Sequence, residues 1–107
     1  MVTPILKVNG GTSDITVPIG TVVLFEVTGA CPGWGVKIIS ITDGYTQIGN
    51  IIVPNSTGYA SMNYTITKTI KVYAWADCSP APLPNSNSII ISTPPICNIP
   101  IANFKLS

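Results

Sequence analysis

Hydrophobic and polar side chains alternate along most of this chain with a period of two residues, and almost no 3.6-residue pattern is present. The alternating runs are rich in Ile, Val, Thr and Tyr, which suit the pleated, half-buried surface of a strand. Short clusters of Gly, Pro, Asn and Asp separate the runs and are typical of turns. We therefore expect an all-β protein of about seven strands. The predicted strands cover residues 5–8, 14–17, 21–28, 36–42, 46–53, 59–67, 69–76 and 88–92, the first two forming one split edge strand.

The alternation also divides each predicted strand into an inner and an outer face. Charged residues mark the outer face on three strands, where Glu26, Lys37 and Lys71 interrupt apolar runs. Residues of the opposite parity then point into the core, because successive side chains of a strand leave opposite faces. The expected core positions are Val23, Phe25, Val27, Trp34, Val36, Ile38, Ala60, Met62, Tyr64, Ile66, Ile70, Val72, Ala74 and Ala76.

The same parity turns four large apolar side chains outward on two strands that we expect to be neighbours. These residues are Ile39, Ile41, Tyr73 and Trp75. Exposed clusters of this kind usually mark protein contacts, so we interpret them as a partner-binding patch. Two alternatives remain open. The end of the chain folds back over the patch, or the assumed parity is wrong.

Composition and charge narrow the function classes. The chain has 107 residues, 8% of them charged, a formal net charge of +1 and no histidine. A nearly neutral chain lacks the positive electrostatic field that attracts nucleic acid. Without histidine, the chain also lacks the commonest general base and the commonest metal ligand. Cys31, Cys78 and Cys97 are spaced too widely for a zinc motif. We expect a non-enzymatic protein with no cofactor, no metal and no nucleic-acid partner.

The chain length predicts a single domain with one core. We expect residues 1–95 to form a β-sandwich. Residues 96–107 retain Ile, Phe and Leu at intervals, so we expect an apolar tail that docks on its own domain or on a neighbouring subunit. No export signal is visible before the first strand, and the prolines of the last third of the chain exclude a membrane helix there.

Three runs of sequence resemble strands of the immunoglobulin-like domains found on bacterial and viral surfaces. The run PIGTVVLFEVTG at 18–29 is similar to their turn and second strand, and the runs GYASMNYTI at 58–66 and KVYAWA at 71–76 are similar to their fifth and sixth strands. The resemblance covers residues 5–93. It implies a two-sheet antiparallel sandwich with Greek-key connections. The chain departs from antibody-type domains, whose paired cysteines lie inside the second and sixth strands.

The resemblance also bears on the cysteines. In the implied topology the second and sixth strands run in the same direction, so the loops that follow them meet at one end of the sandwich. Cys31 and Cys78 lie in these loops and should be neighbours. They form a disulfide in an oxidising compartment, or both remain thiols in a reducing one. We expect Cys97 to lie at the opposite end and to be unpaired.

Two hypotheses for function follow. The first is an Ig-like module displayed on a larger assembly, such as a decoration or accessory protein at the surface of a virus or phage particle, with protein subunits or further copies of itself as partners. The second is an extracellular adhesion or pilus-type module that binds carbohydrate or a receptor through loops around Trp34 and Trp75. Asn55 and Asn63 begin N-glycosylation triplets, which matter only if the protein is exported.

Overall fold

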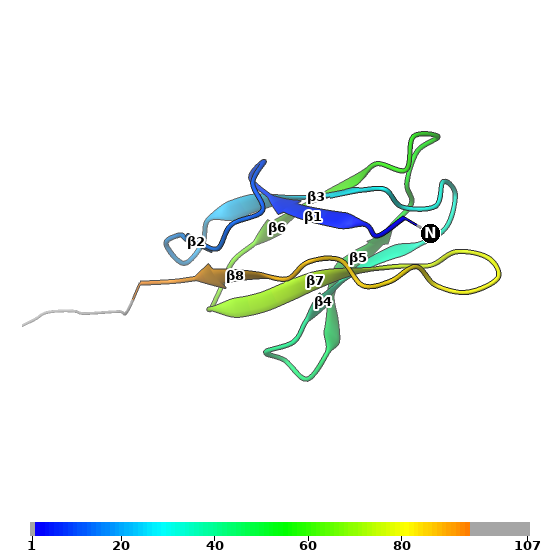
Figure 1. Ribbon diagram of the computed structural model, residues 1–107. Helices are drawn as coiled ribbons and strands as arrows, with labels where there is room; N and C mark the ends of the chain where they lie inside the picture. Colours follow the sequence, from blue (N-terminus) through cyan, green and yellow to red (C-terminus); the bar gives the residue numbers. More distant parts are fainter. Residues whose placement is uncertain (1, 95–107) are drawn as a thin grey trace, which may run out of the picture.

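The computed structural model describes residues 2–94 and contains no helix within them (Figure 1). Predictions for Cys97 and for the tail 96–107 lie outside the described residues. Eight strands follow one another along the chain. They are β1 (Ile5–Val8), β2 (Ile15–Thr16), β3 (Val22–Thr28), β4 (Val36–Ser40), β5 (Thr46–Ile52), β6 (Ala60–Thr65), β7 (Ile70–Ala76) and β8 (Ile89–Ser92).

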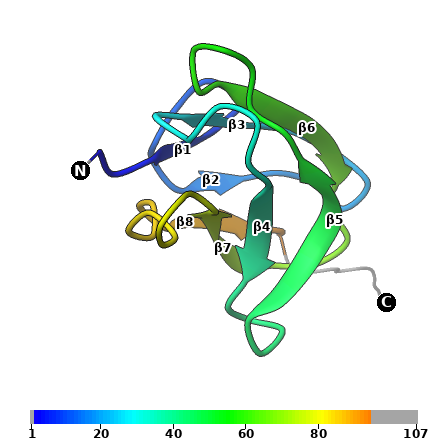
Figure 2. The same ribbon diagram turned by 90° about the vertical axis from the view of Figure 1, so that its right-hand side faces the viewer.

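The strands form two sheets that lie face to face as two layers (Figure 2). One sheet has three strands in the order β1-β3-β6, and the other has five in the order β2-β8-β7-β4-β5. The neighbouring strands are antiparallel except for β2 and β8, which are parallel. The prediction of an all-β, two-sheet protein is confirmed. The prediction that every strand is antiparallel is wrong at β2, where the chain joins the second sheet in the same direction as β8.

The first predicted strand is split between the two sheets. The chain pairs with β3 as β1 and then turns through Asn9 and Gly10, both of which have positive φ. It joins the other sheet as β2, where the Val17 N–H also donates to the Ser92 carbonyl at 2.8 Å. A single edge segment therefore connects both layers on this side of the molecule.

One hydrophobic core fills the space between the sheets. Its buried members are Leu6, Val8, Val23, Phe25, Val27, Ala30, Val36, Ile38, Ile48, Ile66, Ile70, Val72, Ala74, Ala76, Ile89 and Ile91. Met62 and Tyr64 are half-buried and pack against this core, and Ala60 is buried. Each large side chain contributes about 1.5–3 kcal/mol on burial. The predicted inner faces are confirmed on β3, β4, β6 and β7.

A bulge in β5 brings the two sheets together on the opposite side of the molecule. Val36 of β4 pairs with Ile52 and Ile38 pairs with Ile48, so β5 contains two extra residues between these pairs. Gly49 lies in the bulge with a φ of 67°, and a Cβ there would stand 2.6 Å from the Met62 sulfur of β6. Only a residue without a side chain permits so close an approach. The bulge thus lets β5 curve toward β6.

Side-chain amides and carboxylates close the β1 side of the sandwich. The Asn87 Nδ2 donates to the Leu6 carbonyl at 3.0 Å, and the Asn87 Oδ1 accepts from the Leu6 N–H at 2.9 Å. Near β2, the Asp14 Oδ1 accepts from the Ile90 N–H at 2.8 Å. These bonds satisfy main-chain groups of the edge strand β1 and of β8, next to the two-residue β2, that would otherwise be open to another chain.

Gly58 should be among the least replaceable residues of the fold. It has a φ of 80°, and a Cβ there would lie 2.3 Å from the Ala30 carbonyl oxygen. We expect Gly58→Ala to lower the free energy of unfolding by about 2–4 kcal/mol, because it adds a backbone clash to the cost of a positive φ. Gly10→Ala is the matched control, since Gly10 has a φ of 85° with nothing near its Cβ position. Its expected loss is about 1 kcal/mol. Equal losses in urea titrations would contradict the steric explanation.

Candidate binding surfaces

The four residues predicted to bind a partner are brought together on the outer face of the five-stranded sheet. In the β4–β7 ladder Lys37 lies opposite Trp75, and Ile39 lies opposite Tyr73. Residues opposite each other in a ladder project from the same face of the sheet. Ile41 follows the end of β4, where its N–H still bonds to β7 at 2.8 Å. The predicted parity therefore holds on both strands.

Exposure on this face differs from the prediction. Ile39 is only 8% exposed, because it is flanked in register by Gln47 on β5 and Tyr73 on β7. Ile41, Tyr73 and Trp75 are half-buried. The expectation that Ile39 faces water is wrong. Parity decides which face a side chain leaves from, but the size of its neighbours decides whether water reaches it.

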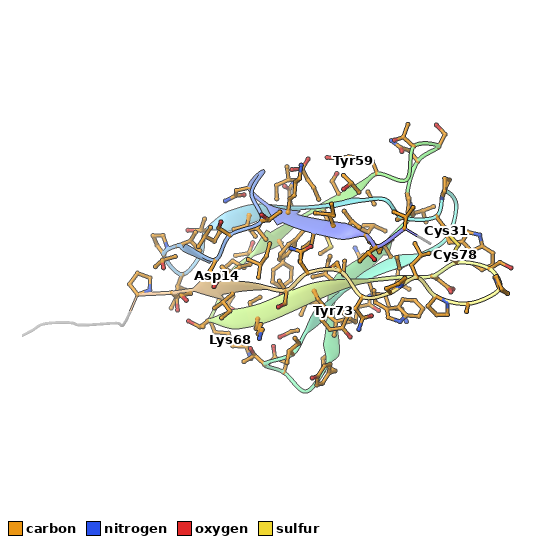
Figure 3. All side chains as sticks on the ribbon, viewed as in Figure 1. Asp14, Cys31, Tyr59, Lys68, Tyr73 and Cys78 are labelled. Carbon is orange, nitrogen blue, oxygen red and sulfur yellow. A yellow bond between two sulfur atoms is a disulfide. The ribbon has the colours of Figure 1, made fainter. Side chains whose placement is uncertain are left out.

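Aromatic rings form much of the solvent-facing layer here. Tyr45, which is 65% exposed, meets Tyr73 edge to face with ring centroids 6.4 Å apart. Trp75 is the next outward residue along β7, and the Lys37 Nζ lies 5.0 Å from the centroid of its ring. Figure 3 shows Tyr73 on the side of the sheet where the β4–β5 hairpin projects. We call Tyr45, Tyr73 and Trp75 the aromatic row.

Tyr45 occupies an unusual backbone conformation for a bulky residue. It has a φ of 64° and follows Gly44, whose φ is 73°, in the turn between β4 and β5. This left-handed region suits Gly and Asn in tight hairpin turns, and a tyrosine there is strained. Strained, exposed residues are found at functional sites more often than elsewhere. Glycine, which has no Cβ, would relax the backbone of this turn.

The same hairpin contains a small polar cluster. The Ser40 hydroxyl, on a fully buried residue, donates to the Asp43 Oδ2 at 2.9 Å, and the Thr46 hydroxyl donates to the Asp43 carbonyl at 2.7 Å. Lys68 forms an ion pair with the Asp43 Oδ1. The hydrogen bonds from Lys68 and Ser40 lower the pKa of Asp43 below its ordinary value.

A second exposed apolar surface lies at the other end of the β4–β5 pair. Trp34 is 42% exposed, and Ile51 and Val53 are 53% and 64% exposed. The Gly33 N–H donates to the Pro54 carbonyl at 3.1 Å, which joins the two segments beyond the strands. We call Trp34, Ile51 and Val53 the end patch.

The prediction that Trp34 belongs to the core is wrong. β4 begins only at Val36, and the Trp34 N–H donates to the Cys31 carbonyl at 3.2 Å in a tight turn. The period-2 alternation therefore does not extend to Trp34. Gly35 leaves space beside it, and a Cβ there would lie 3.0 Å from the Ile51 Cγ2. The neighbouring Ile51 side chain thus reaches over a residue that has none.

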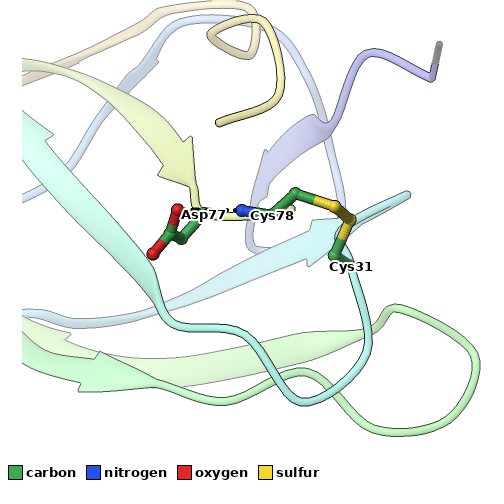
Figure 4. The surroundings of a disulfide bond; sticks show 3 residues. All are labelled: Cys31, Asp77 and Cys78. Carbon is green, nitrogen blue, oxygen red and sulfur yellow. Dashed lines mark hydrogen bonds between the residues drawn. A yellow bond between two sulfur atoms is a disulfide. The ribbon is translucent and has the colours of Figure 1, made fainter. Parts of the chain in front are cut away.

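Cys31 and Cys78 are joined by a disulfide, with their Cα atoms 5.6 Å apart (Figure 4). Cys31 follows β3 and Cys78 follows β7, so the bond connects one strand of each sheet at the same end of the molecule. The Cys78 N–H donates to the Asp77 Oδ1 at 2.9 Å. Both cysteines are half-buried. The turn that contains Trp34 starts at this bond.

The two N-glycosylation triplets lie in different settings. Asn55 is in an exposed loop, where its Oδ1 accepts from the Thr57 hydroxyl at 2.7 Å and from the Tyr59 N–H at 3.1 Å. Asn63 is exposed on β6 and lies opposite Leu24 of β3. Both side chains are open to solvent, and their modification stays a prediction.

Another polar pair lies on the outer face of the three-stranded sheet. The Tyr59 hydroxyl donates to the Glu26 Oε2 at 2.6 Å, and this bond raises the pKa of Tyr59 above its ordinary value. Within residues 2–94, no three His, Cys, Asp or Glu side chains are grouped to hold a metal ion, and no pocket is present. The same residues include no helix long and apolar enough to cross a membrane.

Sequence reasoning did not single out Tyr45, Ile51 and Val53. The signal for Tyr45 is its place directly after Asp43-Gly44, which is typical of a turn. Residues 41–45 separate the paired Ser40 and Thr46, and the dipeptide does not specify that Tyr45 has a positive φ in this loop. The signal for the other two is Gly49 inside an apolar strand, which is typical of a bulge. A single uninterrupted run over 46–53 conceals which of its residues face outward.

No protein-family model matches the sequence, and no curated protein matches it with significance.

The disulfide should contribute a large share of the stability of the protein. It closes a segment with a sequence separation of 47, for which the chain-entropy model gives about 4 kcal/mol. We expect the double variant Cys31→Ser/Cys78→Ser to lose about that much free energy of unfolding in denaturant titrations without reductant. Cys97→Ser serves as the control and should leave the midpoint unchanged. A wild-type midpoint that does not move on reduction would show that the bond contributes nothing.

Asp43 should make stability depend on pH. A folded-state pKa below the unfolded value means that its contribution is complete above about pH 4–5 and is lost as the pH falls through the folded-state pKa. Asp43→Asn should therefore melt at a lower temperature than wild type at neutral pH, and the difference should vanish under acid conditions. Thermal melts from pH 2 to pH 7 test this. High salt should shrink the neutral-pH difference, because the ion pair is exposed and screened. A difference that is constant with pH would contradict it.

Proposed function

We propose that this protein is a non-enzymatic, Ig-like module that docks on a larger assembly at a virion surface or a cell surface. The strand order supports the Ig-like part of the proposal. A three-stranded sheet β1-β3-β6 faces a sheet that includes β8-β7-β4-β5, and the split edge strand belongs to both layers. Antiparallel sandwiches with Greek-key connections have this kind of arrangement. The absence of histidine from the whole sequence supports a role in binding rather than in acid–base catalysis.

The end patch is the observation that carries the proposal. Trp34, Ile51 and Val53 are large apolar side chains that are each at least 42% exposed. They lie on two segments joined by the Gly33–Pro54 hydrogen bond, next to the disulfide. Tryptophan is enriched at the centres of protein interfaces, where it packs with other apolar residues. Docking of this surface on a protein subunit would remove these groups from water.

The disulfide supports a location outside a reducing cytosol. A half-buried cystine that joins both sheets persists in oxidising surroundings, which include cell surfaces and the surfaces of virus particles. On such surfaces a small domain gains from a covalent link, because its core alone is modest in size.

Cosedimentation with the native particle or with the cell-surface fraction from the source of the chain tests the proposal. Wild-type protein should sediment with the assembly. The double variant Ile51→Ser/Val53→Ser should lose at least tenfold in affinity, because two apolar anchors are removed. The matched control is Ile5→Ser/Val22→Ser, which changes two exposed aliphatic residues on the other sheet and should bind as wild type. A monomer that sediments with neither fraction, or equal losses in both variants, would overturn the proposal.

An extracellular adhesion or pilus-type module is the second candidate. The exposure of Trp34 favours it, because the indole lies in a loop at one end of the sandwich and is available to a receptor or a sugar ring. Binding to glycans or to a receptor that is lost on Trp34→Ala would support this candidate. Unchanged binding by that variant would remove its only specific support.

A further inference from the structure

We propose that the aromatic row of Tyr45, Tyr73 and Trp75, with the flanking lysines Lys37 and Lys71, binds an acidic polysaccharide. The proposal goes beyond the proposed function: it names a ligand class and a separate face, and it does not depend on docking through the end patch. The row lies along the outer face of the five-stranded sheet, whereas the end patch is at the disulfide end of the β4–β5 pair.

The geometry of the row suits sugar rings. Tyr45 and Tyr73 have centroids 6.4 Å apart, and Trp75 is two residues along β7 from Tyr73, or about 7 Å for an extended strand. The apolar faces of pyranose rings pack against aromatic π faces by dispersion and by C–H contacts with the ring. The Tyr45 and Tyr73 rings are inclined to each other by 62°, and the Lys37 amine lies over the Trp75 ring, so the row is not one flat platform. Tyr45, which is 65% exposed, is the ring most open to a sugar.

The shape of the face favours a glycan over a protein. Ile39 below the rings is only 8% exposed, so little aliphatic surface remains for the continuous apolar core of a protein interface. A polysaccharide does not need such a core, because it makes its contacts through ring faces and hydroxyl groups.

Charge selects an acidic ligand. Lys37 and Lys71 are on the same face as Tyr73, and the one ion pair among residues 2–94 is that of Lys68 with Asp43. The Lys37 amine is in contact only with the Trp75 ring among the interactions of this face, and Lys71 is exposed. Neither ammonium group forms an ion pair within residues 2–94, so Lys71, and Lys37 from its position over the Trp75 ring, can attract carboxylates spaced along a sugar chain.

The carboxylates near this face are already engaged. Asp43 is bound by Lys68 and Ser40, and Asp77 accepts the N–H of Cys78. Asp14 accepts the N–H of Ile90 across the β2–β8 edge. The ion pair with Lys68 offsets the charge of Asp43 and reduces the repulsion that an acidic ligand would meet there.

The strain at Tyr45 is the independent observation. The turn would be more stable with Gly or Asn at this position, so neither the hairpin nor the core requires the ring. Tyr45 lowers the stability of the turn and exposes an aromatic ring beside Tyr73. A ligand that contacts this ring would account for its presence. Replacement of Tyr45 by glycine should therefore raise the stability of the protein and lower its affinity for the ligand.

Affinity electrophoresis and calorimetric titration with polygalacturonate test the proposal on the full chain. Wild type should bind, and affinity should fall as salt is raised. Tyr45→Gly should reduce affinity at least tenfold while raising the melting temperature by about 2–6 °C, because the turn is relieved. Lys71→Gln should reduce affinity and flatten the salt dependence. Lys7→Gln is the control outside the row, on the other sheet, and it should bind as wild type.

Two further polymers separate the competing explanations. A neutral galactan should bind at least tenfold more weakly than polygalacturonate, and equal binding would overturn the assignment of an acidic ligand. Polyglutamate, like polygalacturonate, has negatively charged carboxylates along its chain, but it has no sugar rings. Equally tight binding of polyglutamate would indicate an acidic peptide partner and overturn the proposal. Absence of polygalacturonate binding, or an unchanged affinity of Tyr45→Gly, would also overturn it. The cosedimentation test of the end patch is independent of these results, because it uses a different surface and different variants.

Discussion

The burial of apolar side chains between two sheets is the interaction on which the rest of the structure depends. Val23, Phe25 and Val27 on β3 face Val72, Ala74 and Ala76 across the core, and all are fully buried. Once these positions are fixed, the pleat decides which residues leave the outer faces. The aromatic row is a consequence of this register, because a shift by one residue would exchange the row for the core.

The open sides of the sandwich are closed by different means. On one side, Asn87 and Asp14 use side-chain atoms to bond the main chain of β1 and β8. On the other side, the bulge at Gly49 lets β5 approach Met62 of β6. Bulges and covered edges discourage pairing with further strands. The two candidate surfaces therefore consist of side chains on a sheet face and a loop, and not of exposed strand backbone.

Much of the fold could be predicted from the sequence, because period-2 alternation and turn residues are local signals. They located every strand to within two residues at either end, and they gave the correct parity on β3, β4, β6 and β7. They failed where local signals end. Trp34 precedes its strand, so alternation does not apply, and Ile39 is covered by neighbours that only the pairing of β4 with β5 and β7 brings close. The strain at Tyr45 and the outward faces of Ile51 and Val53 depend on a turn type and a bulge, which composition suggests but does not specify.

The turn before β4 is fastened at more points than the cystine alone. The Ala30 N–H donates to the Gly58 carbonyl at 3.0 Å, and the Gly33 N–H donates to the Pro54 carbonyl. These contacts connect the residues on both sides of Cys31 to the segment between β5 and β6. Cleavage of the sulfur–sulfur bond would therefore lower the free energy of unfolding of the domain. It would leave the turn that contains Trp34 held by these backbone hydrogen bonds. Display of the tryptophan and covalent reinforcement of the scaffold are thus separable properties of one short loop.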